Sequence, residues 1–582
     1  MHSWFRARLA PVLACHLVLV ACGGGGGGGP DAPVAAAAGR AEATVFHPID
    51  TQLQQCAALR SFTYPALTVS SADSIPAGPV SGVETGPHCR VTGFMNRRSG
   101  VNGAYAIGFE MRLPASWNGR FFFQNNGGFD GVVLPAIGMQ LGGGHTSSAL
   151  SMGFAVISSD AGHSAEQNLP GPGHFGLDPQ ARLDYGYQYI GVLTPMARDL
   201  VRAAYGRAPD RSYIGGCSNG GRQTLVAAAR YPQLFDGYLA GAPGFNLPKS
   251  VVQMLWDTQQ LASAASTTLP DGLPDITSAL SPAERKLVAR RIVEKCDAMD
   301  GARDGMVLDV KACHAAFDFQ ADVPSCGAAR DGNCLDAKQK AALTRMHAGA
   351  SNSAGQALHA SFPIDRGIAY DDWLSWKYHL NPGVGASAMP YLMTSPPAQV
   401  RGDSLLKYSL DFSMDLDAPK IHASGGAYLQ SAMQYLSPPD PADLSALKQR
   451  RGKILVTHGT SDPVFSSDDT AAWYDALRRA NNGDASDFAR YFPVPGMGHC
   501  VGGAATDQFN GITALVEWVE QGKAPATLLA TARGPGNPGG ANPMVPADWS
   551  PGRTRPLCPY PQVARLKLGA TDVESAGSFI CQ

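Results

Sequence analysis

A serine with a glycine two residues to either side stands in the sequence Gly216-Cys217-Ser218-Asn219-Gly220. Residues 211–216 before it predict a strand, and residues 222–232 after it predict a helix. A serine on a sharp strand-to-helix turn is typical of a nucleophile, because small neighbours let the strained turn close. The first N–H groups of the helix would face negative charge that develops on a substrate. Cys217, directly before the serine, is a second potential nucleophile.

A serine hydroxyl needs a general base, and that base needs an acid to orient it. In hydrolases with such a nucleophile turn, the acid and then the base follow the serine in the chain. Two buried-strand patterns occur downstream, one in residues 452–462, which end at Asp462, and one in residues 488–500, which contain His499. We therefore predict that Ser218, Asp462 and His499 form a catalytic triad.

Neighbouring residues offer alternatives for the acid and the base. Asp462 precedes Pro463 and could form a plain turn, which would leave Asp468 or Asp469 as the acid. His458 is the rival base, although a histidine within a strand end is more typical of a protein core.

An oxyanion hole needs two N–H donors. The backbone N–H of Asn219, directly after the nucleophile, is the first candidate. The second comes from the glycine-rich residues 124–131, where Gly128 is the best candidate. A glycine-rich surface turn is the alternative interpretation of this loop.

Alternating strand and helix patterns must position these residues. Strands are predicted in residues 105–113, 119–126, 153–161 and 235–244, and an amphipathic helix in residues 193–206. Such alternation indicates a largely parallel sheet covered by helices, which is an α/β fold of the α/β-hydrolase type. We expect a hydrolase domain made of residues 46–245 and 441–582.

Residues 246–440 interrupt this pattern with many prolines and with the aromatic residues Trp373, Trp376 and Tyr378. An insertion between two strands of such a sheet is well placed to cover the carboxyl ends of the strands. We therefore predict that residues 246–440 form a large inserted lid domain.

Composition limits the partners of the chain. The 582 residues carry 46 basic and 48 acidic side chains and a net charge of −2, so no large basic field exists for nucleic acid. Residues 1–22 resemble a lipoprotein-type signal peptide, and residues 23–45 predict a flexible tether. Cys22 would carry the lipid and anchor the protein to a membrane, and an ordinary secretory signal is the alternative. Both interpretations predict an exported protein. It would be an outer-membrane or periplasmic lipoprotein, or a secreted protein.

The cysteines after residue 22 number ten, and an even count in an exported chain favours five disulfides. Spacing alone does not fix the pairing. Pairs between neighbouring cysteines are the natural first hypothesis: Cys56–Cys89, Cys296–Cys313, Cys326–Cys334 and Cys558–Cys581. They leave Cys217 and Cys500 for each other, and this last bond would join the nucleophile turn to the histidine loop. Two reduced thiols beside the triad, or a zinc site, are the rival readings, and the chain has no C-x-x-C pair to support zinc.

An acidic loop lies within residues 296–313. Asp297, Asp300 and Asp304 crowd a short glycine-containing stretch, and oxygen ligands at this spacing suit calcium. The loop does not match the EF-hand pattern, so a solvated turn is an equally good interpretation of its composition.

Several motifs together resemble the tannase and feruloyl esterase family: residues 216–222, 459–466, 494–500 and 553–561, with further similarity at 175–187 and 241–249. The resemblance implies an α/β-hydrolase domain with a large lid, and carboxylic ester hydrolysis through an acyl-enzyme. It implies the triad, oxyanion donors and disulfide pairs given above. It also implies a structural calcium ion held by Asp297, Asp300 and Asp304 and by the carbonyls of Ala302 and Met306, and an aromatic acyl ring held between Trp376 and Phe465.

One departure from the family bears on the substrate. A family member that hydrolyses a monoester of terephthalic acid clamps the free carboxylate with a lid arginine, but residues 376–400 contain no arginine before Arg401. Asn219 also replaces an acidic residue. We therefore expect a serine hydrolase of feruloyl- or galloyl-type esters, with the terephthalate monoester as the alternative. An inactive surface lipoprotein that binds aromatic esters is the alternative from another class, and a complete triad argues against it.

Overall fold

The structure of the protein, a computed structural model, describes residues 47–48, 55–327, 329–398 and 404–582. The predicted signal peptide 1–22 with Cys22, the tether 23–45 and Arg401 therefore lie outside the described residues. Everything that is described belongs to one unit of the chain, Arg40–Gln582. Within the described part, no helix is both long and apolar enough to cross a membrane.

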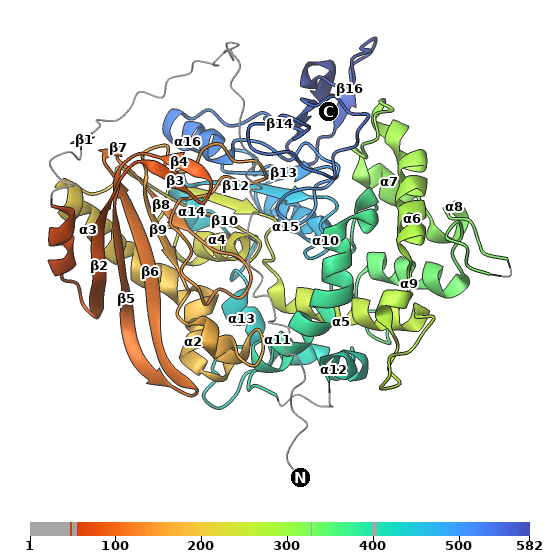
Figure 1. The fold of residues 1–582 in the computed structure, drawn as a ribbon, viewed down its shortest axis with the longest axis horizontal. Coiled ribbons are helices and arrows are strands. Elements are labelled where there is room, and N and C mark those ends of the chain that lie inside the picture. Colours follow the sequence, from red (N-terminus) through yellow and green to blue (C-terminus); the bar gives the residue numbers. More distant parts are fainter. Residues whose placement is uncertain (1–46, 49–54, 328, 399–403) are drawn as a thin grey trace. The chain divides into compact units, whose positions relative to one another are not determined.

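A nine-stranded sheet forms the centre of the protein, in the order β13-β12-β11-β10-β8-β9-β6-β5-β2 (Figure 1). Every neighbouring pair from β13 to β9 is parallel, whereas β6, β5 and β2 pair in antiparallel fashion. The strands are β2 Leu67–Ile75, β5 His88–Gly100, β6 Gly103–Pro114, β8 Arg120–Gln124, β9 Ala155–Ser159, β10 Arg211–Cys217, β11 Gly237–Gly241, β12 Lys453–Gly459 and β13 Ala489–Val494.

The residue patterns of the strands explain this mixture. Every residue of β8, β9 and β11 is buried, as is typical of parallel strands that are covered on both faces. β2 instead alternates between more and less exposed residues for much of its length, as an antiparallel strand at a sheet edge does. The sequence therefore predicts the parallel strands well. The antiparallel pairing of β6, β5 and β2 at one edge of the sheet is not predicted from the sequence.

Helices cover both faces of the sheet. Phe121, Phe123 and Ile214 belong to one buried cluster with Leu193 of α3 and Leu225 of α4. The alternate strand residues, such as Phe122 and Tyr213, belong to another cluster together with α16. The helices outside residues 246–440 are α2 Pro179–Leu183, α3 Tyr189–Tyr205, α4 Asn219–Arg230, α14 Ser445–Gln449, α15 Ser467–Ala480 and α16 Gly511–Gln521.

Residues 246–440, which we call the insert, are largely helical and contain a buried apolar cluster of their own, which includes Leu261, Val288 and Leu343. Figure 1 shows α6 to α9 gathered on the side of the view opposite to β2 and β5. The helices of the insert are α5 Leu247–Ala264, α6 Pro282–Cys296, α7 Val310–Ala316, α8 Phe319–Asp322, α9 Ala337–Ala348, α10 Asp371–Leu374, the π-helix η8 Ser375–Gly385, α11 Ala386–Tyr391, α12 Leu405–Asp411 and α13 Ala432–Leu436.

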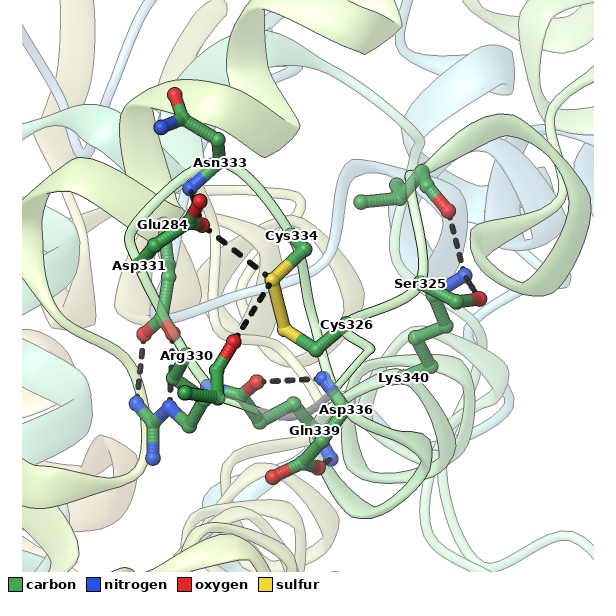
Figure 2. Close-up of a disulfide and its surroundings, with 12 residues drawn as sticks. Glu284, Ser325, Cys326, Arg330, Asp331, Asn333, Cys334, Asp336, Gln339 and Lys340 are labelled. Atoms are coloured by element: carbon green, nitrogen blue, oxygen red, sulfur yellow. Dashed lines mark hydrogen bonds and ion pairs between the residues drawn. A yellow bond between two sulfur atoms is a disulfide. The ribbon is translucent and has the colours of Figure 1, made fainter.

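The Cys326–Cys334 disulfide closes a short loop of the insert (Figure 2). Arg330 of this loop forms an ion pair with the buried Glu284 of α6 at 2.6 Å. Lys340 of α9 donates to the Ser325 hydroxyl at 2.8 Å. The loop is thus attached to two helices of the insert, and its disulfide is remote in sequence from every predicted triad residue.

Among the described residues, five disulfides form, and their pairs are those proposed from the sequence: Cys56–Cys89, Cys217–Cys500, Cys296–Cys313, Cys326–Cys334 and Cys558–Cys581. Stable disulfides fit a protein that is exported to an oxidising compartment. Short antiparallel pairs complete the C-terminal part, formed by β14 Leu528–Thr531 with β15 Thr554–Leu557 and by β16 Ala564–Leu566 with β17 Phe579–Cys581; the remaining short strands are β1 His47–Pro48, β3 Gly78–Val80, β4 Val83–Thr85 and β7 Ser116–Trp117.

Candidate active site

Ser218 stands on a strained turn between β10 and α4. Its φ of 65° and ψ of −126° lie outside the regions that L-residues normally adopt, which costs on the order of 1–3 kcal/mol. A Cβ at Gly216 would clash with the carbonyl oxygen of Asn125, and a Cβ at Gly220 would lie 2.7 Å from the same oxygen. The two glycines are therefore required by the close approach of the backbone that follows β8, which explains the spacing around the serine.

Hydrogen bonds connect Ser218, His499 and Asp462 in series. The Nε2 atom of His499 lies 2.8 Å from the Ser218 hydroxyl oxygen, and its Nδ1 atom lies 2.8 Å from Oδ2 of Asp462. Each residue follows the carboxyl end of a parallel strand, namely β10, β13 and β12. Because these ends lie along one edge of the sheet, residues far apart in the chain meet there.

The Asp462 carboxylate is buried and fully engaged. Its Oδ1 atom accepts the backbone N–H groups of Val464 and Phe465 at 2.8 and 3.1 Å. Burial alone would raise its pKa, but His499 and His458 nearby hold the pKa of Asp462 well below its usual range. The carboxylate is therefore ionised at neutral pH and can stabilise a positive charge on His499.

The alternative acids and the rival base make other contacts. His458 is fully buried, with Nε2 3.2 Å from Asp462 Oδ2 and Nδ1 2.8 Å from the Thr470 hydroxyl oxygen. Asp468 accepts the hydroxyl of Ser361, and Asp469 accepts the side-chain amide of Asn246. His458 thus supports Asp462 from within the core, while the other two aspartates bind residues of the insert.

The Cys217–Cys500 disulfide joins the residue before Ser218 to the residue after His499. The Cα atoms of the two cysteines are 6.0 Å apart, although 283 positions separate them in the chain. The bond therefore connects the nucleophile turn directly to the histidine loop, and Cys217 has no free thiol in this structure.

The glycine-rich loop after β8 lies beside the serine. A Cβ at Gly127 would come within 3.8 Å of the Ser218 Cβ. The Tyr185 hydroxyl lies 3.2 Å from the Gly128 carbonyl oxygen and 3.1 Å from the side-chain oxygen of Asn219. Tyr185 thus connects the two segments from which the predicted oxyanion donors come. It lies in the stretch 175–187 that resembles the family, but no sequence pattern assigned it this role.

The Asn219 side chain is held on both sides. Its Nδ2 atom donates to Asp130 Oδ2 at 2.8 Å, and its Oδ1 atom accepts from Arg222 Nε at 2.7 Å. Burial raises the pKa of Asp130 to about 8, partly offset by hydrogen bonds from Gln223 and Asn219 and by the charge of Arg222. This network fixes the start of α4, which carries the predicted oxyanion N–H.

Two aromatic rings flank the His499 imidazole. The Trp376 ring, from η8 of the insert, has its centroid 5.7 Å from the imidazole, and the Phe465 ring lies at 5.5 Å. Both rings stand edge-on to the imidazole, with interplanar angles of 74° and 69°. The residues predicted to hold an aromatic acyl group therefore adjoin the triad.

The acidic loop between Cys296 and Cys313 folds on its own backbone. Three of its carboxylates accept backbone N–H groups of the loop, each through one oxygen. Asp297 accepts those of Asp304 and Gly305, Asp300 accepts that of Ala302, and Asp304 accepts that of Met306. The other oxygen of Asp304 pairs with Arg555, whereas Oδ2 of Asp300 is buried without a hydrogen-bond partner. Over the described part of the chain, no group of three or more His, Cys, Asp or Glu side chains is arranged to hold a metal ion.

The chain is similar to known proteins over most of its length. A family model described as tannase and feruloyl esterase matches residues 89–582. Over 538 residues the chain is 39% identical to a mono(2-hydroxyethyl) terephthalate hydrolase of Piscinibacter sakaiensis, which covers 88% of this chain and 87% of that protein. A probable feruloyl esterase B-2 of Neosartorya fischeri is 27% identical over 451 residues, with 74% of this chain and 78% of that protein covered.

Solved structures share the fold. The crystal structure of feruloyl esterase B from Aspergillus oryzae matches with a TM-score of 0.72 at 21% identity, covering 91% of this chain and 100% of that one. The sequence matches define the class of protein, which is a carboxylic ester hydrolase. More specifically, the chain belongs to the tannase and feruloyl esterase family.

Proposed function

We propose that this protein hydrolyses esters of aromatic acids through an acyl-enzyme, with Ser218 as nucleophile, His499 as general base and Asp462 as the orienting acid. The observation that carries the proposal is the unbroken hydrogen-bond chain from Ser218 to Asp462, with 2.8 Å at each contact of the imidazole. Such a chain, at the end of parallel strands, is the arrangement that activates a serine hydroxyl.

The proposed reaction has two halves. Ser218 attacks the ester carbonyl while His499 takes the hydroxyl proton, and the N–H groups of Gly128 and Asn219 stabilise the developing oxyanion. His499 then gives the proton to the departing alcohol. In the second half, His499 takes a proton from a water molecule that attacks the acyl-enzyme. The bond between the acyl group and the Ser218 oxygen breaks, His499 returns the proton to that oxygen, and the aromatic acid is released.

We extend the proposal to the architecture, with an α/β-hydrolase domain made of residues 46–245 and 441–582 and a lid made of residues 246–440. The nucleophile turn and the chain order Ser, Asp, His support the first part. The contact of Trp376 with the His499 ring supports the second, because it brings the insert to the triad.

The acyl group that we propose is of the feruloyl or galloyl type, held between Trp376 and Phe465. Lys377, beside Trp376, forms a buried ion pair with Asp257 at 2.6 Å, so its charge is already compensated. A terephthalate monoester carries a free carboxylate that favours a cationic partner. The 39% identity to the terephthalate monoester hydrolase nevertheless makes that monoester the second candidate.

A panel of substrates tests this proposal. Methyl ferulate, methyl gallate and mono(2-hydroxyethyl) terephthalate are compared by kcat/KM, with Ser218→Ala as the inactive control. We expect the first two to be hydrolysed best. Equal or faster turnover of the terephthalate monoester contradicts the acyl preference, and turnover by Ser218→Ala contradicts the mechanism. A folded protein that binds these esters without hydrolysing any of them would be the inactive binding lipoprotein.

We also propose a structural calcium ion at the acidic loop, held by Asp297, Asp300 and Asp304 with the carbonyls of Ala302 and Met306. The unpartnered Oδ2 of Asp300 supports this, because a buried carboxylate oxygen needs a partner and calcium takes oxygen ligands. Export through residues 1–22, with lipidation at Cys22, completes the proposal. Mass spectrometry of the mature N-terminus distinguishes a lipidated Cys22 from a free one.

A further inference from the structure

We propose that Asp372, a residue of the insert, positions the catalytic histidine through the histidine backbone. The inference rests on the proposed role of His499 as general base. It assigns to the insert a part in assembling the triad, in addition to covering the substrate.

Two hydrogen bonds place the Asp372 side chain. Its Oδ2 atom accepts the backbone N–H of His499 at 3.1 Å, and its Oδ1 atom accepts the N–H of Trp373 at 2.7 Å. The first bond crosses 127 positions of sequence and joins α10 to the loop after β13. The second fixes the rotamer of Asp372 from its own helix.

The histidine loop is built for this close approach. A Cβ at Gly498 would clash with the Asp372 carboxylate, so the glycine before His499 lets the loop reach it. Cys500 follows with a φ of 68° and is held by its disulfide to Cys217. Asp372 thus holds the N–H side of His499, while the disulfide holds the residue on the other side.

A second residue of the same helical segment contacts the imidazole itself. Trp376 follows Asp372 by four positions, which places both on one side of a helical turn. Its ring centroid lies 5.7 Å from that of His499. The insert therefore contacts the catalytic histidine twice, at its backbone through Asp372 and at its ring through Trp376.

The chemistry of Asp372 also differs from that of an ordinary aspartate in the first turn of a helix. Burial and the nearby Asp462 carboxylate raise its pKa to about 6. Keeping a second carboxylate beside Asp462 carries an electrostatic cost. A side chain that only accepted an N–H of its own helical turn could equally be a serine or an asparagine, whereas a carboxylate also favours the imidazolium that forms during catalysis.

Matched variants separate positioning from stability. Asp372→Leu keeps the branched shape of the side chain, in a larger form, and removes the acceptor. Asp372→Asn keeps an acceptor, and Asp371→Asn changes the exposed neighbour in the same helix. Because displacement of a catalytic group by about 1 Å can cost about 100-fold in rate, we expect Asp372→Leu to lower kcat by roughly 10- to 100-fold. We expect KM to change by less than about threefold, since the substrate-binding rings remain.

The conservative variants complete the test. Asp372→Asn should retain kcat within roughly fivefold, because its amide oxygen accepts the same N–H, and Asp371→Asn should match the wild type. Labelling of Ser218 by a fluorophosphonate should slow in Asp372→Leu in proportion to kcat. If Asp372→Leu does not fold, Asp372→Ala takes its place. If neither variant folds, Asp372→Asn decides the test: a stable Asp372→Asn protein without activity refutes backbone positioning.

Other results also overturn the inference. A folded Asp372→Leu protein with unchanged kcat and labelling rate, or one that loses only thermal stability, reduces Asp372 to a residue that stabilises the first turn of α10. Failure of the proposed function gives a different result, because Ser218→Ala would then keep its turnover. An inactive Ser218→Ala together with a fully active Asp372→Leu contradicts this inference alone.

Discussion

Removal of the Cys217–Cys500 disulfide should lower kcat even under conditions in which the protein remains folded. The perturbation is the double variant Cys217→Ala/Cys500→Ala, which leaves no free thiol. The bond closes a loop of 283 residues, and loop-closure entropy assigns to it about 5 to 6 kcal/mol as an upper value. The same relation assigns about 2 to 3 kcal/mol to the Cys326–Cys334 bond, whose separation is 8.

The catalytic effect follows from position. Both cysteines adjoin triad residues whose side chains lie 2.8 Å apart, so release of the two loops lengthens the contact between Ser218 and His499. We expect kcat to fall by about 10- to 100-fold at a temperature where the variant remains folded.

The assay compares two double variants by kcat on methyl ferulate and by urea unfolding. The control is Cys326→Ala/Cys334→Ala, which should lose stability and keep kcat, because that loop contacts α6 and α9 instead of the triad. Unchanged kcat in a folded Cys217→Ala/Cys500→Ala protein refutes the reasoning, and so does an equal loss of kcat in the control.

Three further predictions concern the supporting residues. Tyr185→Phe removes the hydroxyl between Gly128 and Asn219 and should lower kcat by roughly 10-fold with little change in KM, measured by steady-state kinetics. Asp130 has a folded-state pKa of about 8, above its unfolded value, so it holds a proton that the unfolded chain releases. The free energy of unfolding should therefore fall by at most about 1.4 kcal/mol per pH unit as pH rises from about 4 to 8. Asp130→Asn should flatten this decline in urea titrations, and an unchanged slope would show the assignment to be wrong. Chelation by EDTA should lower Tm and added calcium restore it, an effect that Asp300→Asn should abolish.

The sequence predicts the parallel part of the sheet and the positions of the triad because both have local signals. β8, β9 and β11 are short, fully buried and mainly apolar, and Asp462 and His499 come within five residues of the ends of β12 and β13. The antiparallel edge is harder to predict, because residues 105–113 indicate a strand without fixing the direction of its partner. That direction depends on the turn between β5 and β6.

Contacts between distant segments leave no local pattern. Asp372 stands before a tryptophan in a short helix and resembles a common first-turn aspartate, yet it reaches His499 across 127 positions. Tyr185 lies in a helical stretch and reaches both Gly128 and Asn219. The disulfide pairs are an intermediate case, because local pairing of the other cysteines left Cys217 and Cys500 for each other. Only the folded arrangement brings such partners together.

Covalent labelling tests the central claim most directly, namely that Ser218 and not Cys217 is the nucleophile. Folded protein is treated with a fluorophosphonate, digested without reduction and mapped by mass spectrometry. We predict one adduct, on Ser218, with Cys217 still bonded to Cys500, and strongly slowed labelling in His499→Ala. No adduct in folded protein, or an adduct on Cys217 or on another serine, would contradict the account.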